Sequence, residues 1–312
     1  MKKMRILVFG YHNVGYVCLK ELIERKENVV AVVTHKGDPS ENIWFNSVYE
    51  LALKSNIPVF SPTDIKGDIF FETLKNLKPE IILSFYYRYL IPENILKIPA
   101  HGAINLHGSL LPKYRGRCPV NWVLINGEKT TGVTLHYMKK SADSGDIISQ
   151  QEVPISEDDD ALTLFNKITE AALSLFKKTW PLIKSGNLHP IPQDPSKATY
   201  FSGRKPENGL IDWKREASEI HNLIRGVTHP YPGAFTFYKG KKLFIWKSEL
   251  ISDKNNINIP CGKILAANDR GIEVKAGEGH LLLKSAQFDC EEELTGKRLF
   301  ERFNSMAGDI LG

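Results

Sequence analysis

The sequence is poor in cysteine, and its few cysteines follow no recognisable pattern. Four are present, too widely scattered for a CxxC metal site or a disulfide framework: Cys18, Cys118, Cys261 and Cys290. Scattered single thiols are typical of a reducing cytosol.

Long apolar runs are also missing. No stretch approaches the roughly 20 apolar residues that a membrane span needs. The apolar segment near the N-terminus passes into a glycine turn without the small-residue cleavage site of a signal peptide. We therefore expect a soluble, cytoplasmic protein with no membrane insertion.

No compositional bias marks the chain as disordered or fibrous. Of its 312 residues, 42% are hydrophobic and 25% are charged, which is ordinary for a globular protein. One core is near its size limit at this length, so we expect two domains.

The formal net charge is +5. The whole excess lies in residues 1–205, because residues 206–312 contain 15 basic and 15 acidic side chains.

Strand and helix patterns alternate through the first third of the chain. Apolar runs rich in β-branched residues predict buried strands at 5–9, 29–33, 80–84 and 104–107. Amphipathic patterns predict helices at 14–25, 47–54 and 69–77. This alternation is typical of a parallel sheet covered on both faces. We predict an α/β fold with a Rossmann-like, doubly wound parallel sheet, whose ligands bind beyond the carboxyl ends of the strands.

The pattern changes in the second half. Strands at 132–137 and 147–153 and a long helix at 161–184 precede a proline-rich connector over 187–205. Then one helix, at 217–225, is followed by five short strands at 234–238, 243–247, 262–265, 271–275 and 280–283. Short strands separated by glycine-rich turns predict a small β-barrel. We expect a first domain over 1–205, connector included, and a second over 206–312.

The fingerprints of common nucleotide and metal sites are missing. Gly10 and Gly15 have the spacing GxxxxG rather than GxGxxG, and no acidic residue follows the second strand, which ends at Thr34 and His35. A tight turn is therefore preferred to NAD or P-loop binding. No metal is expected, because these histidines lack ligand spacing: His12, His35, His101, His107 and His136.

An acidic run at 156–160 directly precedes the long predicted helix. It lacks the glycine and the glutamate spacing of a calcium-binding loop. We interpret it as the helix N-cap, with its carboxylates favourably placed at the positive end of the helix dipole.

Three polar residues combine into a candidate site. Asn105 and His107 lie two positions apart at the end of a predicted strand, so their side chains point to the same face. Such a pair alone is more often structural. Asp143, however, follows the next strand in a turn that can face His107 across the same sheet edge. An amide, an imidazole and a carboxylate together suit acyl transfer without a covalent enzyme intermediate.

The segment HGSLLPKYRG at 107–116, with Asn105 before it and DSGDI at 143–147 after it, resembles the formyltransferase family that uses N10-formyltetrahydrofolate. The likeness extends over nearly the whole chain. Segments 212–213, 221–225 and 231–235 resemble the OB-like second domain of larger members. Within the family, residues 34–35, 84–88, 113–117 and 121–124 are most similar to the formyltransferase domain of the bifunctional enzyme that acts on UDP-4-amino-4-deoxy-L-arabinose.

The resemblance implies roles for individual residues. Asn105, His107 and Asp143 correspond to the catalytic residues. N10-formyltetrahydrofolate is the implied formyl donor, and a nucleotide-linked amino sugar the implied acceptor. The implied folate contacts are Tyr89, Leu90, Ile91, Arg117, Lys139, Lys140, Ser141, Ala142 and Asp143. The sequence leaves a homo-oligomer open, and no nucleic-acid partner is expected.

Two alternatives stay open. Methionyl-tRNA formyltransferase shares the chemistry, but its members carry a longer, basic insertion where this chain has the loop 35–45, with one lysine against two acidic residues. A loop of that sign repels phosphates. A formyltetrahydrofolate hydrolase-like protein is the second alternative.

The motif loop contains three closely spaced cations, Lys113, Arg115 and Arg117. This clustering favours a local pocket for anionic groups over a broad nucleic-acid platform.

Overall fold

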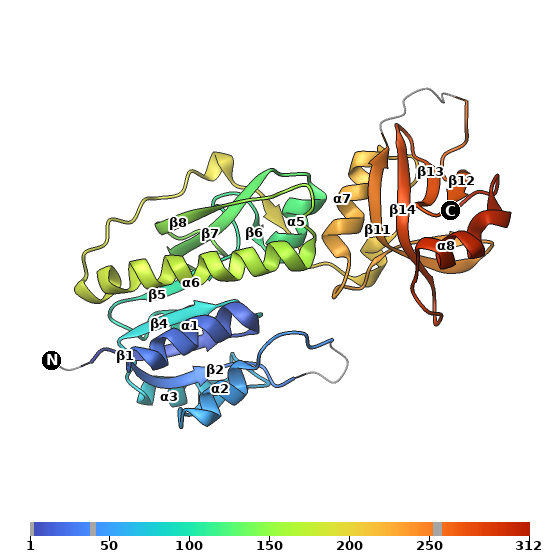
Figure 1. Cartoon of the computed structure of the whole chain (residues 1–312). Coiled ribbons are helices and arrows are strands. Elements are labelled where there is room, and N and C mark those ends of the chain that lie inside the picture. The colour runs from blue at the N-terminus through green and yellow to red at the C-terminus, as the bar shows by residue number, and fades with distance from the viewer. Residues whose placement is uncertain (1–2, 38–41, 252–257) are drawn as a thin grey trace. The chain divides into compact units, whose positions relative to one another are not determined.

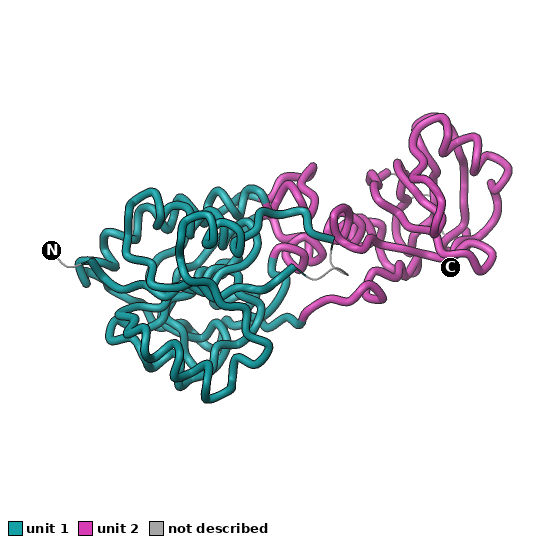
Figure 2. Tube along the Cα trace, turned by 90° about the horizontal axis from the view of Figure 1, so that it is seen from below, with its two compact units in different colours: residues 1–119, 130–154, 166–202 teal, residues 120–129, 155–165, 203–312 magenta. Residues whose placement is uncertain are grey.

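The computed structural model describes residues 3–37, 42–251 and 258–312. The chain divides into two compact units, coloured separately in Figure 2. Unit 1 comprises residues 1–119, 130–154 and 166–202, and unit 2 comprises residues 120–129, 155–165 and 203–312. The units therefore interleave along the chain, whereas the predicted domains meet at a single point. The boundary between 205 and 206 stays a prediction.

Unit 1 is built on a seven-stranded sheet with the order β3-β2-β1-β4-β5-β7-β8. Its strands are β1 (Arg5–Gly10), β2 (Asn28–Val33), β3 (Val59–Phe60), β4 (Ile81–Phe85), β5 (Ala103–His107), β7 (Thr130–Tyr137) and β8 (Ile147–Pro154). In sheet order, the strands from β3 to β5 (β3, β2, β1, β4 and β5) are parallel to one another. β7 runs antiparallel to β5, and β8 antiparallel to β7. The loop between β7 and β8 is too short for the crossover that a parallel pair requires.

Helices cover both faces of this sheet, as Figure 1 shows. One face carries α1 (His12–Glu24), α2 (Val48–Lys54) and α6 (Ala161–Ser185), and the rings of Phe85 and Phe176 meet there at 5.1 Å. The other face carries α3 (Asp68–Asn76) and α4 (Glu93–Leu96), whose Leu74 and Ile95 share a core with Phe9. The predicted doubly wound α/β fold with a mainly parallel sheet is confirmed.

Unit 2 contains α7 (Ala217–Val227) and an antiparallel sheet with the order β10-β11-β14-β13-β12. The strands are β10 (Ala234–Tyr238), β11 (Lys241–Ile251), β12 (Ile264–Asn268), β13 (Gly271–Lys275), β14 (His280–Phe288) and β15 (Leu294–Thr295), and α8 (Gly296–Phe303) follows. The segment 308–312 connects the two edges, because Leu311 N–H donates to Gly262 O and Gly312 N–H donates to Phe237 O, both at 2.9 Å. These bonds join both edges of the antiparallel sheet to the last residues of the chain.

Several short elements had no counterpart in the sequence prediction. They are β3, β15, β6 (Arg115–Gly116), β9 (Tyr200–Phe201), α4, α5 (Pro119–Ile125) and α8. The strands among them have two residues each, too few for an alternating pattern. None of the helices in the described residues is long and apolar enough to cross a membrane.

The predicted N-cap of α6 is confirmed. Asp160 Oδ1 accepts hydrogen bonds from the backbone N–H groups of Leu162 and Thr163, each at 2.9 Å. Asp159 Oδ2 accepts one from the N–H of Ser156 at 2.7 Å. Asp160 thus satisfies backbone donors that the first turn of a helix leaves without partners, and Asp159 stabilises the turn that precedes it.

The GxxxxG segment forms the turn from β1 into α1. A Cβ on Gly15 would lie 3.1 Å from the carbonyl carbon of Gly10, so the turn has little room for a side chain. Within it, the His12 ring stacks on Phe45 with centroids 3.9 Å apart. Burial lowers the pKa of His12 to about 3, and the nearby charge of Arg88 acts in the same direction.

This burial predicts a loss of stability on acidification. The unfolded chain protonates His12 below about pH 6.5, whereas the folded protein does so only near pH 3. The unfolded state therefore binds more protons between these values, and stability falls with falling pH by up to about 1.4 kcal/mol per pH unit. We expect His12→Asn to weaken this dependence, because the variant lacks the titrating imidazole. Asparagine is chosen because it tolerates the positive φ of position 12.

Urea unfolding of the wild type and His12→Asn at pH 7.0 and at pH 4.5 measures the effect. Between pH 7.0 and pH 4.5, the free energy of unfolding should fall more for the wild type than for His12→Asn. A difference that is the same at both pH values would contradict the assignment.

Candidate active site

The site begins at the carboxyl end of β5, where Asn105 and His107 project from the same face of the strand. His107 Nε2 donates to the backbone oxygen of Tyr114 at 2.8 Å. The side-chain amide of Asn105 lies 3.1 Å from His136 Nε2. Both residues are therefore held by partners from other segments of unit 1.

Asp143 lies in the loop between β7 and β8 and approaches both histidines. Its Oδ1 is 3.6 Å from His107 Nδ1 and 3.6 Å from His136 Nε2. Its Oδ2 accepts the N–H of Gly116 at 2.8 Å. Burial by itself raises the pKa of the Asp143 carboxyl, but the two imidazoles and the Gly116 N–H outweigh it and hold the pKa well below its usual range. The carboxylate is therefore ionised at neutral pH.

The hydrogen bonds to carbonyl oxygens fix the ring nitrogens that carry protons. A carbonyl only accepts, so His107 carries a hydrogen on Nε2 and presents Nδ1 to Asp143. His136 Nδ1 donates to the oxygen of Tyr137 at 2.8 Å, so its Nε2 accepts from the Asn105 amide in the neutral form. That bond uses one of the two amide hydrogens and sets the orientation of the Asn105 side chain.

His136 was not among the predicted site residues. It stands opposite Asn105 in the antiparallel pairing of β5 with β7 and is buried. The neighbouring strand therefore brings it into the site. The sequence places a histidine on a predicted strand, but only the register between the two strands reveals which residue it faces.

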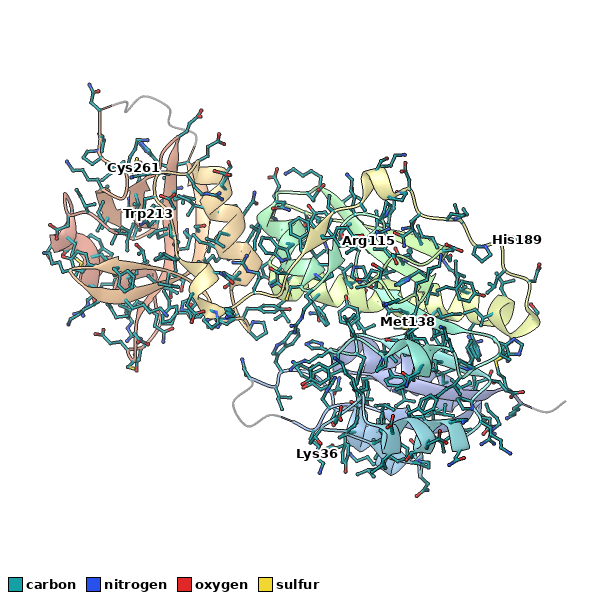
Figure 3. All side chains as sticks on the ribbon, turned by 180° about the vertical axis from the view of Figure 1, so that it is seen from behind. Lys36, Arg115, Met138, His189, Trp213 and Cys261 are labelled. Atoms are coloured by element: carbon teal, nitrogen blue, oxygen red, sulfur yellow. The ribbon has the colours of Figure 1, made fainter. Side chains whose placement is uncertain are left out.

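The predicted folate-contacting residues lie at three places in unit 1: a first segment at 89–91, a second segment at 139–143, and Arg117 in the motif loop. Tyr89 and Leu90 are 59% and 72% exposed, while Ile91 is only 7% exposed and belongs to the core beside α4. Met138, labelled in Figure 3, packs against that same core directly before the second segment. The two segments thus reach the same side of the sheet.

In the second segment, Ala142 is half-buried and the three residues before it are exposed: Lys139, Lys140 and Ser141. Lys139 pairs with Asp146 at 2.8 Å. Arg117 is also exposed.

Arg115 corrects the expectation of three cations lining an anion pocket. Its side chain is buried, with only 4% of the residue exposed, and its Nε and one terminal nitrogen donate to Gln193 Oε1 at 3.1 and 2.6 Å. The other terminal nitrogen donates to the hydroxyl of Tyr200. All three of its side-chain nitrogens bond to other residues of the protein, so the exposed cations of this loop are Lys113 and Arg117.

The arrangement joins three groups with complementary chemistry. The Asn105 amide can donate to a developing oxyanion, the His107 imidazole can exchange a proton through Nδ1, and the Asp143 carboxylate can stabilise the imidazolium that results. In the described part of the chain, no group of three or more His, Cys, Asp or Glu side chains is arranged to hold a metal ion. This set of groups is suited to acyl transfer.

Two family models match the chain. The formyl transferase model matches residues 2–179, and the model of the formyl transferase C-terminal domain matches residues 204–304. Together they cover most of the sequence, so the chain belongs to the formyl transferase family. The resemblance found in the sequence is thereby confirmed.

Solved structures with this fold include two sugar formyltransferases. An N-formyltransferase from Helicobacter canadensis, in complex with folinic acid and dTDP-3-aminofucose, is 23% identical, covers 92% of this chain and 100% of its own, and has a TM-score of 0.72. WlaRD, a sugar 3N-formyl transferase solved with dTDP and 5-N-formyl-THF, is 23% identical, with 94% and 100% covered and a TM-score of 0.70.

Methionyl-tRNA formyltransferase from Clostridium thermocellum is 20% identical, with 81% of this chain and 96% of that chain covered and a TM-score of 0.56. At these identities the likeness shows a common fold.

The bonds of His136 predict a measurable loss of stability. His136→Phe leaves the oxygen of Tyr137 and the amide of Asn105 without this partner in a buried environment. We expect the free energy of unfolding to fall by about 1–3 kcal/mol. Urea unfolding at pH 7 measures it, with His101→Phe as the matched control at an exposed position. Equal stability of the two variants would show that the His136 bonds contribute nothing.

Proposed function

We propose that this formyl transferase moves a formyl group from N10-formyltetrahydrofolate to the amine of a nucleotide-linked amino sugar. The observation that carries the proposal is the meeting of Asn105, His107 and Asp143 at the carboxyl edge of the sheet. Family membership identifies the transferred group. The free thiols of all four cysteines are consistent with the cytoplasm as its compartment.

In the proposed mechanism the neutral sugar amine attacks the formyl carbon bound to N10 of the folate. The carbonyl oxygen gains negative charge in the tetrahedral intermediate, and Asn105 donates an amide hydrogen to it. Removing one such donor typically raises the barrier by about 2.7–4 kcal/mol. His136 holds the amide in the orientation that this bond requires.

Proton transfer falls to His107. Nδ1 takes the proton from the attacking nitrogen and returns it to N10 as the bond from the formyl carbon to N10 breaks, while Nε2–H stays anchored on Tyr114 O. The products are the N-formyl sugar and tetrahydrofolate. Asp143 stabilises the imidazolium while it exists, and proton transfer of this kind contributes roughly 100- to 10,000-fold.

The folate contacts are part of the proposal. The pterin lies along Tyr89–Ile91 and Lys139–Asp143, and Arg117 offers a cation to the anionic tail. Support comes from the convergence of these two segments on one side of the sheet. The two similar sugar enzymes were solved with folinic acid and with 5-N-formyl-THF.

The acceptor class follows from the same comparison. The two sugar enzymes are covered over their full length and were solved with dTDP-3-aminofucose and with dTDP, whereas the methionyl-tRNA enzyme has a lower TM-score. This ranking favours an amino sugar over tRNA. Of the loop 35–45, on which the sequence argument against tRNA depends, residues 38–41 lie outside the described part of the chain.

The acceptor is tested by a panel. The protein is incubated with N10-formyltetrahydrofolate and one of four additions: UDP-4-amino-4-deoxy-L-arabinose, a dTDP-3-amino sugar, methionyl-tRNA, or no acceptor. We expect tetrahydrofolate release and a formylated product with an amino sugar only. Release of tetrahydrofolate without any acceptor would support the hydrolase alternative. Formylated methionyl-tRNA would support the methionyl-tRNA formyltransferase alternative.

Substitutions test the roles. We expect Asn105→Ala to lower kcat roughly 100- to 1,000-fold, His107→Ala roughly 100- to 10,000-fold, and Asp143→Asn to be severely impaired because the imidazolium loses its counter-charge. The exposed His101→Ala serves as the control and should match the wild type. Near-normal turnover by either alanine variant of the site would refute its assignment.

A further inference from the structure

Residues 191–201, here called the strap, lie outside both family matches, which end at residue 179 and begin again at residue 204. The sequence predicts a proline-rich connector there. In the structure the strap is bound to the rest of unit 1 by backbone pairing. Ile191 exchanges two hydrogen bonds of 2.8 Å with Ile147 of β8. Further along, β9 pairs in parallel with β6 in the motif loop.

The middle of the strap carries Gln193, whose side chain reaches the loop of Asp143. Its Nε2 donates to the backbone oxygens of Asp143 at 2.8 Å and of Gly145 at 2.6 Å. Its Oε1 accepts from two nitrogens of Arg115. Every polar atom of this side chain is therefore bonded, and none remains for a ligand.

Arg115 connects this bridge to the motif loop. Its N–H donates to Thr199 O at 2.9 Å, and its side chain donates to Gln193 and Tyr200. The next residue, Gly116, gives its N–H to the Asp143 carboxylate. Asp143 is thus held on both sides, at its backbone by Gln193 and at its carboxylate by Gly116.

The loop around Asp143 is one that needs such support. Asp143 adopts a left-handed conformation, with a φ of 52°, which residues with a side chain adopt only rarely. A Cβ on Gly145 would lie 1.7 Å from Tyr137 O, so the loop packs directly on the β7 backbone. The two donors of Gln193 hold the carbonyls of a strained segment in this packed position.

We infer that Gln193, together with Arg115, is a positioning residue for the formyl transfer: through the backbone of Asp143 it fixes the carboxylate opposite His107. The inference rests on the proposed function. Neither side chain touches the reacting atoms. Loss of the bridge lets the carboxylate shift, and a misplacement of about 1 Å can cost about 100-fold in rate.

The test compares Gln193→Met with the wild type, because methionine keeps the approximate volume and removes both donors and the acceptor. We expect kcat to fall roughly 10- to 100-fold, while KM for the amino sugar stays unchanged. The pH profile of kcat/KM should shift in the same direction as that of Asp143→Asn. Gln151→Met makes the same chemical change on β8, outside the strap and the Asp143 loop, and should match the wild type.

Two further variants separate positioning from simple support of the fold. If Gln193 and Arg115 act as one unit, the loss in Gln193→Met/Arg115→Met is smaller than the product of the two single losses. Arg115→Lys, which keeps a donor, should recover part of the activity lost in Arg115→Met. If circular dichroism shows Gln193→Met to be unfolded, Arg115→Lys replaces Gln193→Met in the test.

Each result decides one question. A folded Gln193→Met with wild-type kcat and an unchanged pH profile overturns the inference while the wild type still transfers formyl. A lower kcat with an unchanged pH profile also overturns it, since that pattern marks mere structural support. A wild type inactive toward every acceptor of the panel overturns the proposed function, and the inference with it.

Discussion

The largely buried negative charge of Asp143 is the constraint on which the rest of the site depends. Removing a carboxylate from water is costly unless other groups supply hydrogen bonds and opposite charge. Here the backbone N–H of Gly116 donates to the carboxylate, and two imidazoles lie 3.6 Å from it and supply opposite charge when they are protonated; the pKa of the carboxyl is correspondingly low. Each imidazole also has a hydrogen bond that fixes it: His107 to the backbone oxygen of Tyr114, and His136 to that of Tyr137. The Asp143 carboxylate therefore positions the neighbouring side chains of the site, in addition to its proposed role in stabilising the imidazolium.

The fold was predictable where the sequence is strongly patterned. The central strands are continuous apolar runs, fully buried in β4 and nearly so in β1, and the sequence located them within a residue or two. The short elements were missed because their pattern is too brief. α8 has eight residues, of which only Leu299 and Phe303 are buried, so its sequence is dominated by exposed charges.

The candidate site was predictable to the extent that local geometry defines it. The alternation of a strand places Asn105 and His107 on one face. His136 depends on the register of β5 against β7, and Gln193 depends on contacts 48 and 50 residues away, which no local pattern contains. Arg115 was read as an exposed cation because arginine usually is one. Partners from the strap, Gln193 and Tyr200, make its burial tolerable.

The pairing of the strap with the motif loop also affects how the protein can be divided for study. A fragment cut at the end of the first family match, residue 179, contains Asn105, His107 and Asp143. It lacks β9 and therefore exposes the hydrogen-bonding edge of β6, and it deprives the buried guanidinium of Arg115 of its acceptors. A minimal catalytic fragment must accordingly extend through residue 202, the last residue of unit 1.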